Sequence, residues 1–193
     1  MRHTLLTVAA GMLIAACSSS SAPSTALSTA VATSAQDAHG AHSAVGNGTL
    51  TPEQLQGVAA VRKATTQFHD IAAAKAAGYN VQYPAGCAES PQGAQAFHYL
   101  NNSLVDATVE LLQPELLMYE PQPNGKMQLI GVDYVVPLTA SATAPTLLGV
   151  PFARNEPLGV WALHIWSARP NPSGMFAAWN PKVSCQYASR ATP

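Results

Sequence analysis

Charged residues are scarce in this chain of 193 residues, because Asp, Glu, Lys and Arg together make up 10 % of it. An ordinary soluble protein has about 25 %. The lysines and arginines are scattered along the sequence, and the formal net charge is −1. A protein that binds nucleic acid needs a basic surface to neutralise the phosphates. The composition therefore predicts no nucleic-acid partner.

The short motifs that identify common catalytic sites are also missing. The chain has no Gly-x-Ser-x-Gly elbow, no His-Glu-x-x-His helix, no phosphate-binding glycine loop and no dinucleotide fingerprint. The candidates that remain are a dispersed set, namely His98, Glu115, Asp133 and His164.

Long apolar runs are lacking as well. The run from Leu5 to Ala16 follows Arg2 and is shorter than the about 20 residues that a membrane-spanning helix needs. A charged start, a short apolar run and small residues at its end are typical of an export signal. We predict such a signal in residues 1–16.

The end of this run, Ile14-Ala15-Ala16-Cys17, resembles the lipobox of bacterial lipoproteins, and a serine-rich tract follows it. The resemblance implies cleavage before Cys17 and acylation of its thiol, so that lipid chains anchor the protein to the membrane. If the host has an outer membrane, Ser18 implies that the protein is anchored in that membrane and faces the periplasm. A plain signal peptide that is cut elsewhere is the alternative.

Residues 17–48 are rich in Ser, Ala and Thr and contain no bulky aromatic residue. Such a segment buries too little apolar surface to offset the entropy of ordering it. We predict a flexible tether here, followed by a single globular domain in residues 49–193, which is an ordinary size for one domain.

Cysteine is rare too, with three in the whole chain. If Cys17 carries lipid, Cys87 and Cys185 are the pair left in an oxidising compartment, and they are predicted to form a disulfide. Closing a loop of roughly 100 residues contributes on the order of 4 kcal/mol in the chain-entropy model. A catalytic or metal-binding thiol is the alternative.

Three stretches predict the fold. Thr51-Pro52-Glu53-Gln54 is a capping box with proline at the first helical position, and it predicts a helix over residues 51–77. Residues 159–166 are dense in aromatic and β-branched side chains, which is typical of a buried strand. Residues 115–119 and 126–136 flank Asn124-Gly125, a favoured hairpin turn. We therefore expect an α+β fold, with a long N-terminal helix packed on a small antiparallel sheet of about four strands, and one disulfide.

The length of the hairpin turn decides where two carboxylates point. With a two-residue loop, Glu115 lies opposite Tyr134 and on the other face from Asp133. A three-residue loop or a bulge shifts the register by one residue and places Glu115 beside Asp133. The sequence does not choose between these registers.

Polar residues within apolar segments are candidates for a site, because buried polar groups need partners. Two histidines and one carboxylate are a common ligand set for zinc, copper or iron. We predict His98, Glu115 and His164 as metal ligands, with Asp133 and Trp166 lining a pocket for a small ligand. The same residues could serve a metal-dependent hydrolase or oxidoreductase. Alternatively, both histidines are core residues bonded to the backbone, and the protein has a structural or protein-binding role without a small-molecule site.

Several tracts of the domain are similar to an uncharacterised family of secreted bacterial proteins. The similar tracts are HYLN from His98, PELLMYEP from Pro114, GVDYVVP from Gly131, LHIW from Leu163, NPSGMF from Asn171 and WNPKVSC from Trp179. The resemblance covers most of residues 51–185. It implies export and the disulfide, and it implies no activity.

Overall fold

The computed structural model describes residues 48–191 of the chain. The predicted export signal, Cys17 and all but the last residue of the predicted tether lie outside these residues. The described part is mostly β, with a seven-stranded antiparallel sheet and a separate two-stranded sheet. The α+β class with about four strands is therefore wrong. Within the described residues, no helix is both long enough and apolar enough to cross a bilayer.

The large sheet has the strand order β1-β3-β4-β5-β9-β8, and β2 pairs with β3 beside this path. Its long strands come from the predicted hairpin and from the predicted buried strand, whereas the additional strands are two or three residues long. The strands are β1 (Val81–Gln82), β2 (Ala88–Ser90), β3 (Gly93–Leu100), β4 (Leu116–Pro121), β5 (Met127–Pro137), β8 (Ala153–Asn155) and β9 (Val160–Ile165). The small sheet pairs β6 (Thr146–Leu147) with β7 (Val150–Pro151).

The predicted long helix is broken in two. The capping box at Thr51 is present, and α1 (Pro52–Ala64) follows it. The hydroxyl groups of Thr65 and Thr66 then bond back to the carbonyl groups of residues in the preceding turn, which weakens a helix. After the 3₁₀ turn η2 (Thr66–His69), Asp70 caps a new helix, α2 (Ile71–Ala76). The remaining 3₁₀ turns are η3 (Asn102–Leu104) and η4 (Ala188–Arg190).

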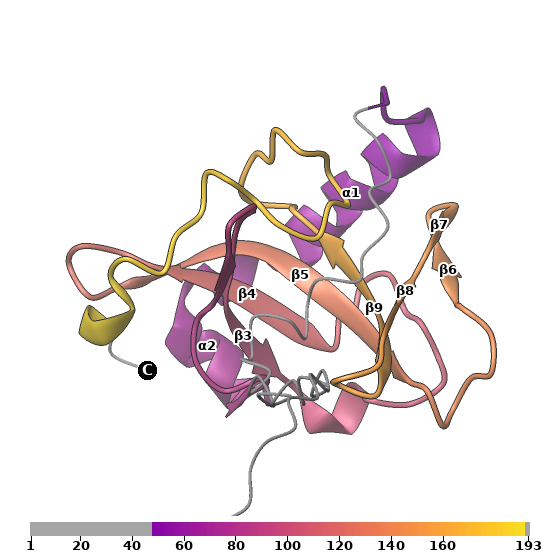
Figure 1. Ribbon diagram of the computed structural model, residues 1–193, viewed down its shortest axis with the longest axis horizontal. Coiled ribbons are helices and arrows are strands. Elements are labelled where there is room, and N and C mark those ends of the chain that lie inside the picture. Colours follow the sequence, from indigo (N-terminus) through magenta and orange to yellow (C-terminus); the bar gives the residue numbers. More distant parts are fainter. Residues whose placement is uncertain (1–47, 192–193) are drawn as a thin grey trace, which may run out of the picture. The chain divides into compact units, whose positions relative to one another are not determined.

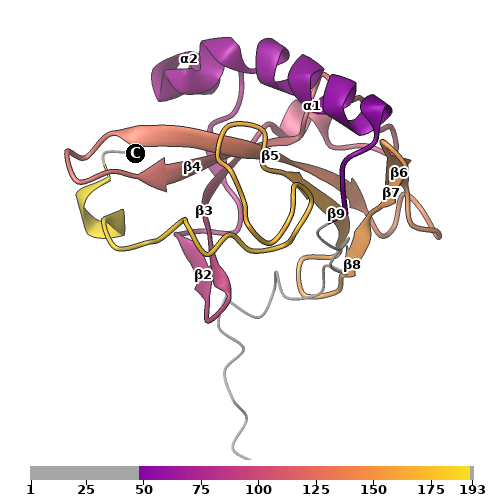
Figure 2. The same ribbon diagram turned by 90° about the horizontal axis from the view of Figure 1, so that it is seen from above.

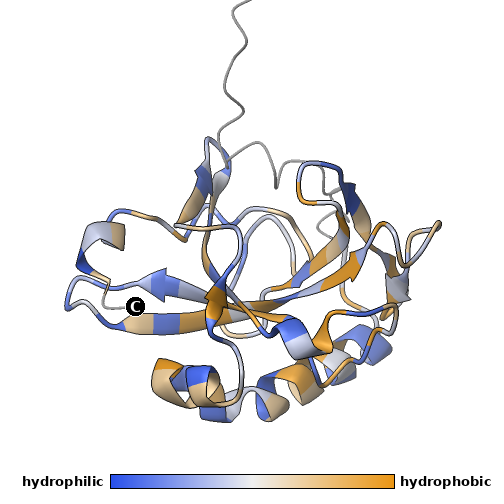
Figure 3. Ribbon diagram, turned by 90° about the horizontal axis from the view of Figure 1, so that it is seen from below, coloured by the Kyte–Doolittle hydropathy of each residue, from blue (hydrophilic) through white to orange (hydrophobic). Residues whose placement is uncertain are grey.

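The central sheet has a different cover on each face. Helices α1 and α2 lie along one face, and the segment after β9 crosses the other (Figures 1 and 2). We call these the helix face and the strap face, and we call residues 167–191 the strap. Figure 3 shows hydrophobic residues along the strands, while the helices carry both hydrophobic and hydrophilic residues. The helices therefore contribute an amphipathic cover to a largely apolar sheet.

Alternation along the strands separates the residues of the two faces. Val58, Val61 and Phe68 of the helical segment pack on the helix face, in one core cluster with Leu117, Tyr119, Val132, Tyr134, Trp161, Leu163 and Ile165. On the strap face, Val183 of the strap packs in a second cluster with Ala94, Ala96, Met118, Ile130 and Trp166. Strands β3, β4 and β5 therefore contribute to both of these cores, whereas β9 contributes to the helix-face cluster and, through Val160 and Ala162, to a third cluster.

The strap has little regular structure, but it is fastened at several points. Asn180 exchanges two backbone hydrogen bonds with Ala94 of β3, at 3.1 and 3.2 Å. Cys185 forms the predicted disulfide with Cys87, which confirms that pairing. Both cysteines pack against the strap-face cluster, so the disulfide fixes the strap over this face.

Candidate metal centre

Three polar residues on the strap face come from different strands of the sheet. Asp133 of β5 lies directly opposite His164 of β9. His98 of β3 lies opposite Met118, which in turn lies opposite Gly131 of β5. The strand pairing therefore places the side chains of His98, Asp133 and His164 on one face and within one row of each other.

The side chains of these three residues converge. The Nε2 atoms of His98 and His164 are 3.4 Å apart, and Nε2 of His164 is 3.6 Å from Oδ2 of Asp133. One potential ligand atom from each residue lies within 4.8 Å of the other two. A buried group of two histidines and one aspartate can therefore hold a metal ion.

All three residues are withdrawn from solvent, with exposed fractions of 1 % for His98, 3 % for Asp133 and 0 % for His164. Within residues 48–191, Oδ1 of Asp133 has no hydrogen-bond partner. Burial is the largest cause that raises the pKa of Asp133 well above its usual range, and the charge of Glu115 raises it further, whereas hydrogen bonds from the backbone at Leu163 and Tyr134 lower it. A buried carboxylate with an unsatisfied oxygen is costly without a cation, and a metal ion removes that cost.

The spacing of the donors fits a transition metal. Zinc–nitrogen and zinc–oxygen bonds are roughly 2.0–2.2 Å long, so two ligands at a tetrahedral angle lie about 3.4 Å apart. The observed separations of 3.4 and 3.6 Å are close to this value. The donors are nitrogen and oxygen without sulfur, which suits zinc, iron(II) or copper(II) better than copper(I).

Glu115 lies apart from this group, although it was predicted as the carboxylate ligand. Its side chain is buried, and Oε2 accepts a hydrogen bond from the backbone N–H of Val135 at 3.1 Å. Burial is the largest cause that raises the pKa of Glu115, to about 8. The carboxylate beside the two histidines belongs to Asp133, which was predicted to line a ligand pocket.

The register of the hairpin explains this placement. The turn is a three-residue loop, because Pro121 pairs with Met127 and Gln122 bonds to Lys126 around Pro123-Asn124-Gly125. The pairing then shifts between Met118 and Tyr119. The loop and the bulge each displace the register by one residue, and their effects cancel. Asp133 therefore lies opposite Leu116 and on the other face from Tyr134, so the register does not place Glu115 beside it.

Trp166 adjoins the metal group through His164. The two rings are stacked, with centroids 6.3 Å apart, and the indole Nε1 donates to the carbonyl oxygen of Ala177 in the strap at 2.7 Å. Trp166 therefore packs beside His164 and also holds the strap. Its exposed fraction of 1 % places it in a core, not in an open pocket.

Gly131 also belongs to this face, although nothing in the sequence singles it out. A Cβ atom there would lie 2.7 Å from Cε of Met118 and 2.5 Å from the backbone oxygen of Ile165. The missing side chain therefore leaves space for Met118, which lies between His98 and Gly131 in the same row. No pattern in the sequence predicts this close approach, because the approach depends on the pairing of three strands.

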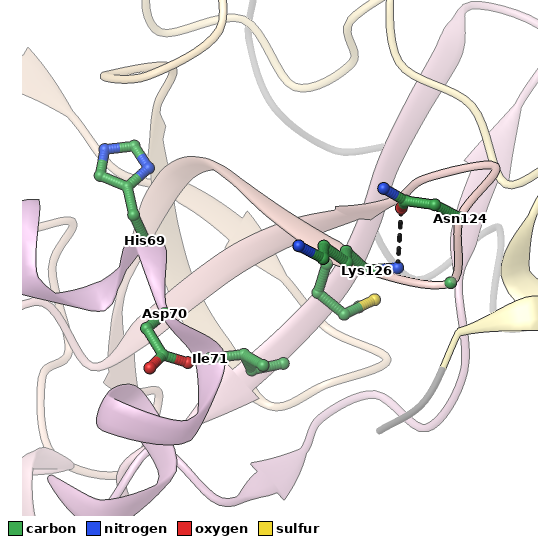
Figure 4. A pocket seen from close by; sticks show the side chains of 7 residues that line it. His69, Asp70, Ile71, Asn124 and Lys126 are labelled. Carbon is green, nitrogen blue, oxygen red and sulfur yellow. Dashed lines mark hydrogen bonds between the residues drawn. The ribbon is translucent and has the colours of Figure 1, made fainter.

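Surface hollows lie elsewhere in the described residues. A hollow of about 510 Å³ separates the start of α2 from the hairpin turn, and Figure 4 shows His69, Asp70 and Ile71 on one side with Asn124 and Lys126 on the other. A smaller hollow of about 110 Å³ is lined by Glu115 and by other residues of the loop before β4. Neither hollow is lined by His98, Asp133 or His164.

The function of this site has to be inferred from its geometry. Comparisons with protein-family models, with curated proteins and with solved structures found no match for this chain.

Proposed function

We propose that this domain binds one divalent transition-metal ion through Nε2 of His98, Nε2 of His164 and the carboxylate of Asp133. The observation that carries the proposal is Oδ1 of Asp133, which is buried beside two imidazole groups and has no hydrogen-bond partner within residues 48–191. Two neutral imidazoles and one carboxylate leave a net charge of +1 on a divalent ion, and three ligands leave room for water or a small molecule.

The proposal places this site in the cell envelope. The lipobox-like sequence at Cys17 supports a lipid anchor, and residues 17–48 would connect the anchor to the domain. The disulfide is consistent with an oxidising compartment. In this arrangement the membrane is the partner of the N-terminus, and the metal is the ligand of the domain.

A metal-dependent hydrolase or oxidoreductase is the second candidate. It is favoured by the ligand count, since catalytic metal sites commonly have three protein ligands and an open position. The exposed fractions of 0–3 % for the three residues restrict the reactants that reach the site to water and other small molecules.

Elemental analysis of the full chain, purified without a histidine tag, tests metal binding. We expect about one equivalent of zinc, iron or copper in the wild type and none in His98→Ala/His164→Ala. His69→Ala is the matched control, because His69 is an exposed histidine outside the group. Wild-type protein that contains no metal and takes none up on dialysis against these ions would contradict the proposal.

A second pair of variants identifies the carboxylate ligand. Asp133→Asn should lose the metal, whereas Glu115→Gln should retain it, because the Glu115 side chain bonds to Val135. The opposite result would return Glu115 to the ligand set and remove Asp133 from it.

A further inference from the structure

The strap covers the strands that carry the proposed metal ligands. It bonds to β3 through Ala94 and Asn180, and it bonds to Trp166, directly after β9, through the backbone N–H and the indole Nε1. His98 lies on β3 and His164 on β9. Between residues 175 and 180, the strap therefore spans from the strand of one ligand to the strand of the other.

Further contacts hold the strap against this face. The side chain of Gln95 in β3 donates to the carbonyl oxygen of Ala178 at 2.9 Å. The N–H of Ser184 donates to Oε1 of Glu120 at 3.0 Å. Gly93 permits the closest approach, because a Cβ atom there would lie 2.3 Å from the backbone oxygen of Asn180.

The disulfide attaches the strap covalently to the rest of the domain. Cys87 and Cys185 both pack against the cluster that contains Met118 and Trp166. Met118 lies opposite His98, and Trp166 stacks on His164. The disulfide is therefore one layer of side chains away from the proposed ligands, on the side that the strap closes.

We propose that the Cys87–Cys185 disulfide is a redox latch, which retains the metal ion while it is closed and permits exchange when it is reduced. This inference rests on the proposed function. In the reducing step, a dithiol reductant passes two electrons and two protons to the disulfide. The reductant becomes a disulfide, and Cys87 and Cys185 become thiols.

Reduction removes the covalent link between Cys185 of the strap and Cys87, directly before β2, while the hydrogen bonds at Ala94, Gln95, Trp166 and Glu120 remain. Backbone hydrogen bonds that lie between short irregular segments open more readily than those of a core strand. The fold is held by the helix-face core and by the long strands, so the site can open without global unfolding. The metal then leaves or enters through the loosened strap.

The test measures the release of zinc from the full chain into a chromophoric chelator. Zinc-loaded protein is compared in its oxidised form, after reduction with a water-soluble phosphine, and as Cys87→Ser/Cys185→Ser. The phosphine is oxidised to its oxide and contains no thiol that competes for zinc. We expect about one bound zinc in each form and release at least tenfold faster from the two forms without the disulfide.

Controls separate the latch from general loss of stability. Val58→Ala removes packing on the helix face and leaves the disulfide and the hydrogen bonds of the strap in place, so it should release zinc at the wild-type rate. Reduction of Cys87→Ser/Cys185→Ser should have no further effect. If that variant does not fold, Gln95→Leu loosens the strap without changing the disulfide and should accelerate release two- to threefold in the oxidised protein.

The outcomes distinguish the two proposals. One bound zinc with equal release rates before and after reduction overturns the latch and leaves the metal site intact. An equal acceleration in Val58→Ala also overturns the latch, because it would assign the effect to stability. No bound zinc in any form overturns both.

Discussion

The two faces of the central sheet bury polar groups in different ways. On the helix face, the hydroxyl groups of Tyr79, Tyr119 and Tyr134 each donate to a backbone carbonyl oxygen, at 2.9, 2.6 and 2.6 Å. On the strap side, Oδ1 of Asp133 and Oε1 of Gln95 are buried without a hydrogen-bond partner within residues 48–191. Polar groups are thus satisfied on one side and incompletely satisfied on the other.

This difference has an energetic consequence. A buried polar atom without a partner costs about 1–3 kcal/mol, and a charged group costs more. The three tyrosine hydroxyl groups of the helix face avoid this cost. The strap face retains the cost of an unsatisfied polar atom, Oδ1 of Asp133, next to two converging imidazoles. Such a cost is expected of a site that a ligand completes. Substitutions on each face can test whether the faces differ in this way.

The largest expected effect lies at Glu115, where β4 begins. The pKa of Glu115 is raised from 4.5 to about 8 in the folded protein, mainly by burial. A raised folded pKa means that the stability contributed by the protonated group is complete below about pH 4.5 and is lost as the pH rises through about 8. At one pKa unit per about 1.36 kcal/mol, the loss is at most about 5 kcal/mol.

Glu115→Gln should remove this pH dependence, because the amide stays neutral and its oxygen still accepts from Val135. Urea unfolding in the presence of a chelator, between pH 4.5 and 9, measures it. The free energy of unfolding of the variant should exceed that of the wild type increasingly as the pH rises. Parallel curves over this range would show that Glu115 is ionised in the folded protein at neutral pH.

The next effect tests the helix face. Leu117 is fully buried in the core beneath the helices, and Leu117→Ala should lower the free energy of unfolding by about 3 kcal/mol. The loss should be the same with zinc and with chelator, because the side chain points away from the metal group. A loss that appears only with zinc would show that the two faces are not independent.

The sequence predicted those parts of the fold that depend on local chemistry. The capping box at Thr51, the strand at residues 159–166, the hairpin at Asn124-Gly125 and the Cys87–Cys185 pair are all present. Each rests on residues that act on their immediate neighbours or on the count of cysteines. The seven-stranded sheet was not predicted, because β1, β2 and β8 have two or three residues and show no periodicity.

The site was harder to predict for the same reason. His98 and His164 stand out as polar residues in apolar strands, and the structure brings them together. The choice between Glu115 and Asp133 depended on a three-residue loop and a bulge that cancel each other. The bulge follows from packing across strands, so neither it nor the space at Gly131 leaves a signal in the sequence.

A smaller effect tests the strap face through its ligand. Zinc at about 100 times its dissociation constant should raise the free energy of unfolding of the wild type by about 2.7 kcal/mol. Asp133→Asn should show no such gain, yet in chelator it should be as stable as the wild type or more stable, since the amide removes a buried carboxylate. Chemical unfolding with and without zinc measures both the stabilisation by zinc and the stability in chelator. Glu115→Gln is the control, because zinc should stabilise it as much as it stabilises the wild type. A variant that is strongly destabilised in chelator would make Asp133 a structural residue.

The smallest effect compares a buried tyrosine hydrogen bond with an exposed one. Tyr119→Phe removes the bond to the carbonyl oxygen of Phe68 and leaves that oxygen buried, so we expect a loss of about 1–2 kcal/mol. Tyr83→Phe is the matched control, because Tyr83 makes the same kind of bond to Leu158 at 3.1 Å from a side chain that is 36 % exposed. Water can replace that bond, so the control should lose less than about 0.5 kcal/mol. Equal losses in the two variants would mean that burial does not increase the contribution of these tyrosine hydrogen bonds to the free energy of unfolding. The contrast between the two faces of the sheet would then have no energetic basis.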